Sequence, residues 1–267
     1  MTKGIVLSLY DFTGEALKPW AEAGYECHAF DIQHPVEGRT EGNIHYRHAD
    51  LHKVSTFKAL LAEFGDSGDL VVFGMAFPVC TDMAVSGAAW FKKKAVADPD
   101  FQIKAVNYAV CCSVFFEDLG VPYFVENPVS VLATKWRKPD YRFHPYEYGG
   151  YIPDTEAEHP RWPEYIAAKD AYKKQTCLWT GGGFVMPTKV SVDPEAYHGN
   201  GYSTSMMKLG GKSQRTKDIR SATPRGFAKA VCEANKREST QNEKHTTQQH
   251  PKAPAHNQGY HSARGYD

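Results

Sequence analysis

The sequence lacks several patterns that would assign it to a class of protein. It has no Cys-x-x-Cys pair, so its six cysteines are not spaced for a thiolate zinc site. It has no apolar run that approaches the length of a membrane span, and we expect no membrane partner. Its 31 basic and 31 acidic residues balance, so overall charge does not indicate a nucleic-acid-binding protein and a local basic patch must be sought.

Two nucleotide-related motifs are missing as well. Zinc deaminases need His-x-Glu and Pro-Cys-x-x-Cys, and neither occurs, so that class is disfavoured. We assign no residue to a metal, because the four histidines of the C-terminal tail match no known spacing. The first glycine turn contains Gly14 but no full Gly-x-Gly-x-x-Gly, which favours a cofactor without a pyrophosphate over a dinucleotide.

The cysteines are scattered, and the apolar run after Met1 is too short for a secretory signal. We therefore expect free thiols, a reducing cytoplasmic location and a monomer.

Short apolar runs alternate with helical patterns along most of the chain. We expect strands at residues 5–9, 25–31, 70–73, 123–126 and 173–180, and helices at 15–23, 55–64, 101–119 and 223–232. In the longest helix an apolar stripe should run through Ile103, Val106, Val110, Val114 and Leu119. This alternation predicts an α/β fold with a doubly wound, mostly parallel sheet.

Two strands of this sheet should deliver reactive side chains to one edge. The strand at 70–73 leads into a loop with Pro78 and Cys80, and the strand at 123–126 ends at Glu126. Ligands bind outside the carboxyl ends of such strands, so Cys80 and Glu126 should lie at the same edge. The alternative for Cys80 is a small buried apolar residue in a loop.

One acidic residue, Asp31, is a candidate for binding a nucleoside, and a second, Asp50, is weak evidence by itself. Asp31 ends the second strand at an interval from Gly14 that suits an acid bound to ribose hydroxyls. The alternative is a solvated strand end. Asp50 precedes a helix, and an aspartate there is usually an N-cap.

The chain divides into four regions. We expect a cofactor-binding and catalytic core at 1–128, a loop-rich insertion with aromatic anchors at 129–172, the rest of the core at 173–234 and a disordered tail at 235–267. Between Lys208 and Lys229 stand seven basic residues and one acid. This stretch, including Lys212, Arg215 and Lys217, suits phosphate contacts, although a charge run can be a solvated face.

Seven motifs, taken in this order, resemble the DNA cytosine-5 methyltransferases in the compact form of phage and prophage genomes. The resemblance runs from about Gly4 to Ala234, through residues 5–14, Asp31-Ile32, Asp50-Leu51, Phe77-Pro78-Val79-Cys80, Glu126-Asn127-Pro128, residues 173–181 and residues 220–228. The chain departs from the family at Phe12 and Glu15 in the first motif, at Val79 for a proline, and at Lys174 and Thr176 for two arginines.

The resemblance implies a Rossmann-like S-adenosylmethionine-dependent methyltransferase fold, DNA as partner and the cytoplasm of the host cell if the gene is phage-borne. It implies Cys80 as nucleophile, Glu126 at the nitrogen 3 edge of cytosine and Lys174 as the cation beside the thiol. It also implies that S-adenosylmethionine is held by Tyr10, Gly14, Asp31, Ile32, Asp50, Leu51 and Pro78. Only residues 182–212 stand where larger members carry a target-recognition domain.

Two other functions remain open from the sequence. One is a related enzyme that adds a different group to carbon 5 of a pyrimidine, or that acts on a free nucleotide. The other is a catalytically silent protein that binds nucleic acid or cofactor. The presence of both Cys80 and Glu126 argues against a catalytically silent protein, and the altered glycine motif argues for one.

Overall fold

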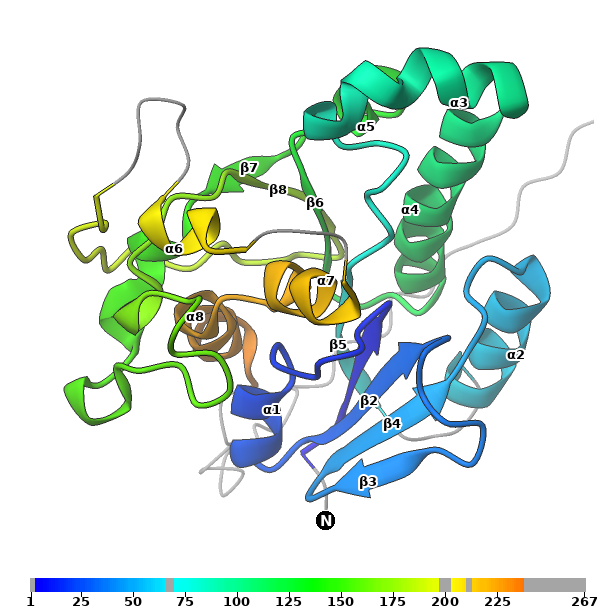
Figure 1. Cartoon of the computed structure of the whole chain (residues 1–267). Coiled ribbons are helices and arrows are strands. Elements are labelled where there is room, and N and C mark those ends of the chain that lie inside the picture. The colour runs from blue at the N-terminus through cyan, green and yellow to red at the C-terminus, as the bar shows by residue number, and fades with distance from the viewer. Residues whose placement is uncertain (1–2, 66–69, 197–202, 210–212, 238–267) are drawn as a thin grey trace, which may run out of the picture. The chain divides into compact units, whose positions relative to one another are not determined.

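Eight strands form a single sheet in the order β3-β4-β2-β1-β5-β6-β8-β7 (Figure 1). The computed structural model describes residues 3–65, 70–196, 203–209 and 213–237, which all belong to one compact unit. The strands are β1 (Ile5–Leu9), β2 (Glu26–Asp31), β3 (Arg39–Glu41), β4 (Ile44–His48), β5 (Val71–Ala76), β6 (Tyr123–Pro128), β7 (Tyr141–Phe143) and β8 (Thr176–Gly181). Strands β4, β2, β1, β5 and β6 are parallel, whereas β3, β8 and β7 each pair antiparallel with a neighbour.

Helices cover both faces of the sheet (Figure 1). They are α1 (Lys18–Glu22), α2 (Val54–Gly65), α3 (Phe91–Ala97), α4 (Phe101–Asp118), α5 (Leu132–Lys135), α6 (Thr204–Met207), α7 (Gln214–Ser221) and α8 (Arg225–Asn235). Four 3-10 helices lie at Val85–Trp90, Pro145–Tyr151, Asp154–Glu156 and Ala168–Asp170. Helix α1 begins three residues later than expected, at Lys18, and has Pro19 in its first turn, where a proline is tolerated.

Strand β1 lies at the centre because both of its faces are apolar. Its five residues are all buried. Ile5, Leu7 and Leu9 pack with residues of α2 and α4, whereas Val6 packs on the other side with residues of α1 and α8. The expected α/β architecture with a mostly parallel sheet is therefore confirmed.

Helix α4 packs with part of the expected stripe. Val106 is buried, and Val110 and Leu119 pack against the same core, as the sequence predicts. Ile103 and Val114 differ from the expectation, because they are 55% and 47% exposed. Cys112, Phe115 and Phe116 are buried instead. The two aromatic rings and the thiol remove more apolar surface from water than the two β-branched side chains, so the helix turns this side to the sheet.

The strand order reverses between β1 and β5. Their carboxyl ends lie side by side, with Leu9 in register with Ala76, and the Phe77 N–H donates a 3.0 Å hydrogen bond to the Leu9 carbonyl. Such a topological switch point is where open α/β sheets bind ligands. The loops with Tyr10 and Cys80 both begin here. Among the described residues, no helix is long and apolar enough to cross a membrane.

Candidate active site

Cys80 lies in a tight turn at the carboxyl end of β5. Its carbonyl oxygen accepts hydrogen bonds from the N–H groups of Met83 and Ala84, at 2.9 and 2.8 Å. The side chain is partly buried, while that of the preceding Val79 is 45% exposed. All six cysteines are free thiols, so Cys80 is not consumed by a disulfide.

Strand β6 holds the Cys80 loop in place. The buried side-chain amide of Asn127 donates a 3.0 Å hydrogen bond to the carbonyl oxygen of Pro78. Glu126 stands one residue earlier on the same strand, so a single contact relates the position of Glu126 to that of Cys80. The placement of Pro78 in this contact gives it a structural role, beside the cofactor role that the resemblance implies.

Lys174 reaches this edge because β8 runs antiparallel to β6. In that pairing Pro128, at the end of β6, faces Thr176, at the start of β8. Lys174 therefore stands just before β8, at the carboxyl edge of β6. Its Nζ donates a 2.8 Å hydrogen bond to the carbonyl oxygen of Arg220. Arg220 directly precedes Ser221, which lines the hollow described below.

The three side chains are close enough to change one another's protonation. Burial raises the pKa of the Cys80 thiol, the Glu126 carboxylate raises it further, and the Lys174 ammonium lowers it. Burial also raises the pKa of Glu126, and Lys174 lowers it. One cation therefore stabilises a negative charge on either Cys80 or Glu126, and burial disfavours two anions together.

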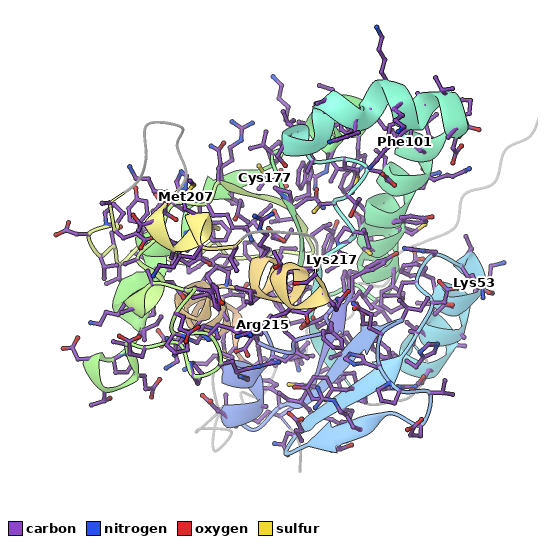
Figure 2. All side chains as sticks on the ribbon, viewed as in Figure 1. Lys53, Phe101, Cys177, Met207, Arg215 and Lys217 are labelled. Carbon is purple, nitrogen blue, oxygen red and sulfur yellow. The ribbon has the colours of Figure 1, made fainter. Side chains whose placement is uncertain are left out.

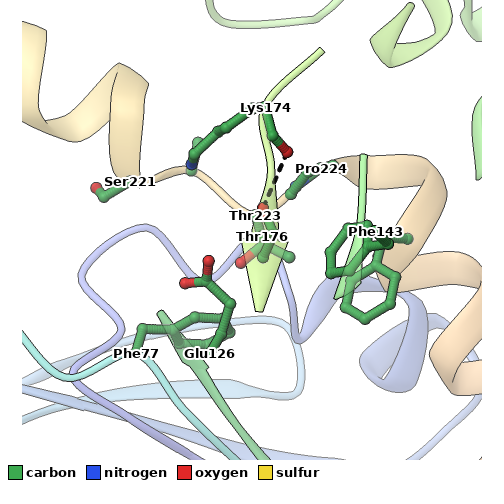
Figure 3. A pocket seen from close by; sticks show the side chains of 10 residues that line it. Phe77, Glu126, Phe143, Lys174, Thr176, Ser221, Thr223 and Pro224 are labelled. Carbon is green, nitrogen blue, oxygen red and sulfur yellow. Dashed lines mark hydrogen bonds between the residues drawn. The ribbon is translucent and has the colours of Figure 1, made fainter. Parts of the chain in front are cut away.

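A small hollow opens beside Glu126. Figure 3 shows the Glu126 carboxylate directed into it, on the side of Lys174 and Thr223. The other residues of its lining come from the Cys80 loop, β7, β8, the end of α7, the segment before α8 and α8 itself: Phe77, Phe143, Thr176, Ser221, Ala222, Pro224 and Phe227. Among the described residues, Glu126 has no hydrogen-bond partner, so its carboxyl group is free to bind a ligand.

Asp11 stabilises the loop that follows β1 and contains Gly14. Its buried carboxylate accepts a 2.7 Å hydrogen bond from the Gly14 N–H and a 2.8 Å bond from the Ser8 hydroxyl. Gly14 has φ of +68°, and a Cβ there would stand 2.5 Å from the Tyr46 hydroxyl oxygen, so the turn requires glycine. Tyr10 has φ of +58°, a conformation that non-glycine residues seldom adopt outside functional loops.

The loops after β1 and β4 bring Tyr10 and Leu51 together. The Tyr10 hydroxyl donates a 2.7 Å hydrogen bond to the Leu51 carbonyl, and Leu51 is buried. Asp50 forms a 3.0 Å ion pair with Lys53, and this contact lowers the pKa of Asp50. Its carboxylate also accepts from the His52 N–H at 3.2 Å, which is the local turn expected of an aspartate before a helix.

Asp31 and Ile32 stand at the carboxyl end of β2. One oxygen of the Asp31 carboxylate accepts from the backbone N–H and the side-chain amide of Gln33, at 2.8 and 3.2 Å. Among the described residues, its second oxygen makes no hydrogen bond or ion pair. Ile32 is 52% exposed, so an apolar surface lies beside this carboxylate.

Two of the three candidate DNA contacts lie on α7. Arg215 and Lys217 are exposed on this helix (Figure 2), and the Arg215 guanidinium lies 5.5 Å from the centroid of the Tyr165 ring. Lys212 lies outside the described residues. The side-chain amide of Gln214, in the first turn of α7, donates a 2.6 Å hydrogen bond to the side chain of Gln33. The basic helix thus contacts the loop after Asp31.

Several residues of the site were not singled out from the sequence. Asn127 stands within the Glu-Asn motif, and Thr223 and Phe227 stand within the last motif, so their positions carried a signal. Asp11 stands within the first motif, and its contacts with Ser8 and Gly14 are local. Phe143 carried no signal, because it packs on Phe227, which is far from it in the sequence. Comparison of the chain with protein-family models and with curated proteins found no match.

Proposed function

We propose that the chain is an S-adenosylmethionine-dependent DNA cytosine-5 methyltransferase. The observation that carries the proposal is the meeting of Cys80, Glu126 and Lys174 at one edge of the sheet, beside the switch point. They come from three segments far apart in the sequence. A thiol, a carboxyl group of raised pKa and a cation beside the thiol are groups that covalent catalysis on a cytosine ring can use.

Carbon 5 of cytosine is a poor nucleophile, and Cys80 would overcome this by covalent catalysis. Its thiolate gives an electron pair to carbon 6, and the ring becomes an enamine that is nucleophilic at carbon 5. S-adenosylmethionine would supply the methyl group. Removal of the proton from carbon 5 then returns the electron pair to the ring, and the thiolate leaves carbon 6.

Glu126 would hold the opposite edge of the base. A protonated carboxyl group can donate a hydrogen bond to ring nitrogen 3 and stabilise the charge that develops there. The raised pKa of Glu126 favours this protonated form. Once Glu126 is neutral, its effect on Cys80 disappears, and Lys174 is left to stabilise the thiolate.

The cofactor edge fits a nucleoside in part. The second oxygen of Asp31 can accept from a ribose hydroxyl, and the exposed side chain of Ile32 can cover an adenine ring. The Gly14 N–H is occupied by Asp11, which agrees with a cofactor that has no phosphate to bind there. Leu51 and Asp50 lie on the strand-end loop beside this edge.

Arg215 and Lys217 would contact the phosphates of DNA. Both are exposed on α7, which ends directly before the segment that lines the hollow at Glu126. A base within a duplex must leave its stack to reach a group at such a depth, so we propose that the target cytosine is flipped out of the helix.

A cofactor-binding protein without transfer activity is the second candidate. The raised pKa of Cys80 favours it, because a protonated thiol is a weak nucleophile.

One experiment separates the two candidates. DNA that contains 5-fluorocytosine should trap the protein in the presence of S-adenosylmethionine, because fluorine cannot leave carbon 5 as a proton does. The adduct should survive denaturing electrophoresis, and Cys80→Ser should abolish it while Cys111→Ser leaves it intact. Methylation of DNA without trapping, or trapping that persists in Cys80→Ser, contradicts the proposed nucleophile. Binding of cofactor with no methylation favours the second candidate.

A further inference from the structure

Three potential metal ligands meet on one face of the sheet, far from the reactive edge. Strands β2 and β4 are parallel, and His28 stands in register with His45. Glu26 is two residues before His28, so its side chain leaves β2 on the same face. The ligand atoms of Glu26, His28 and His45 all lie within 4.8 Å of one another.

We infer that Glu26, His28 and His45 form a binding site for a zinc ion. The Glu26 Oε1 lies 3.0 Å from Nε2 of His28 and 4.0 Å from Nε2 of His45. Zinc binds nitrogen and oxygen ligands at about 2.0–2.2 Å, which places two ligands of a tetrahedral ion about 3.4 Å apart. Both oxygen–nitrogen distances are already close to this spacing, so small movements of the side chains would bring the three atoms to it.

The surroundings favour coordination by neutral imidazoles. The Thr40 hydroxyl lies 3.1 Å from Nδ1 of His45, so the outer nitrogen of this ring is held and Nε2 faces Glu26. The His28 ring lies 4.9 Å from that of His45, centroid to centroid. A neutral imidazole offers a lone pair to a metal ion.

The charge at the site also suits a divalent cation. Arg47 is the nearest cationic side chain on β4, and both of its terminal nitrogens are held by Glu63 of α2, at 2.6 and 2.9 Å. The Glu63 carboxylate therefore neutralises the positive charge of Arg47. The negative charge of Glu26 is left to balance that of a bound cation. The Phe64 ring, in the last turn of α2, packs edge-on against the His28 ring at 5.2 Å, centroid to centroid.

The site lies at the opposite end of β2 from the candidate cofactor edge. Glu26 begins β2, whereas Asp31 at the other end of this strand belongs to the candidate cofactor edge. The side chains of Glu26 and His45 are 35% and 36% exposed, so a metal has a path of entry and water can fill the fourth position. An ion here would join β2 to β4 and stabilise the folded chain.

The test is a zinc titration of the full chain by calorimetry. The wild type should bind one more equivalent of Zn²⁺ than His45→Asn or Glu26→Gln, or bind it more than about tenfold more tightly, since loss of even an outer-shell partner costs that much. The matched control is His52→Asn, which removes an exposed histidine elsewhere. A second control replaces the four tail histidines, His245, His250, His256 and His261, by asparagine and should keep the tight site.

Cobalt and heat give independent readouts of the same site. Co²⁺ should give visible absorption bands of a tetrahedral complex in the wild type and in the tail variant but not in His45→Asn. Zinc should raise the unfolding temperature of the wild type and not that of Glu26→Gln. Equal zinc stoichiometry and affinity in the wild type, His45→Asn and Glu26→Gln would overturn the site and leave a hydrogen bond between Glu26 and His28. None of these readouts depends on methyl transfer.

Discussion

The side-chain amide of Asn127 donates a 3.0 Å hydrogen bond to the carbonyl oxygen of Pro78, and both groups are buried. This contact joins the strand that carries Glu126 to the loop that carries Cys80, across 49 positions of sequence. The contact therefore fixes the loop that carries Cys80 relative to the strand end that carries Glu126.

Asn127→Ala should lower both stability and activity. The Pro78 carbonyl would lose its buried donor, which costs about 1–3 kcal/mol of the free energy of unfolding. Urea denaturation measures this loss, and the trapping rate with 5-fluorocytosine DNA measures the effect on Cys80. Asn43→Ala is the control, since the exposed Asn43 amide makes only a 3.5 Å contact. If Asn127→Ala trapped DNA at the wild-type rate, the contact would not position the loop.

Asp31→Ala should weaken the binding of S-adenosylmethionine with the fold intact. Loss of a hydrogen bond to a charged group costs about 1.5–3 kcal/mol, so the dissociation constant should rise about 10- to 150-fold. Calorimetric titration gives the constant directly. Asp98→Ala removes an aspartate whose side chain is 42% exposed and that is paired with Lys104, and it should bind cofactor like the wild type. An unchanged constant in Asp31→Ala would remove this residue from the cofactor site.

Glu126→Gln should stabilise the protein at neutral pH while it slows trapping. Burial raises the pKa of Glu126 above its ordinary 4.5, so the folded chain binds this proton more tightly than the unfolded chain. Stability that is present below pH 4.5 is therefore lost as the pH rises through the folded-state pKa. Glutamine cannot ionise, and its advantage should disappear in acid.

Glu63→Gln is the matched control with the opposite sign. The Arg47 guanidinium lowers the pKa of Glu63, so this carboxylate stabilises the folded chain above its unfolded pKa and loses that effect as the pH falls. Its replacement should destabilise at neutral pH. Unfolding curves of both variants from pH 4 to pH 8 give the comparison. If the two differences had the same sign, the burial of Glu126 would not control its proton.

Neutralising Arg215 and Lys217 to glutamine should flatten the salt dependence of DNA binding. Each lost phosphate contact reduces the slope of log K against log salt by about 0.9. Fluorescence anisotropy at several salt concentrations measures this slope. The same change at Lys58 and Lys138, which are exposed elsewhere, should leave it unaltered. An unchanged slope in the Arg215 and Lys217 variant would mean that α7 presents a solvated face.

Local patterns predicted the central strands well. Strands β1, β2, β5 and β6 are short apolar runs between glycine turns, and this signal is contained within a few residues. Strand β7 has three residues in an aromatic segment, with Tyr141 and Arg142 exposed, so no alternation marked it. The antiparallel placement of β8 beside β6 is a property of the whole sheet, and the sequence of β8 does not carry it.

The grouping of site residues was predictable in part. Cys80 and Glu126 were predicted to lie at the same edge of the sheet, because each stands at the carboxyl end of its own strand, where open α/β sheets bind ligands. The contact of Gln33 with Gln214 joins residues 181 positions apart, and no local pattern reports it. His28 and His45 likewise meet only because β2 and β4 pair in one register.

The antiparallel pairing of β6 with β8 has a consequence for how the chain can vary. The two strands form the stem of a hairpin whose long loop runs from residue 129 to residue 175. The six register pairs of this stem hold Glu126 and the start of β8 together whatever the loop contains. Each doubling of a loop costs only about 0.6 kcal/mol in closure entropy. Segments of this loop can therefore be lengthened or shortened while Glu126 and the start of β8, just after Lys174, keep their places.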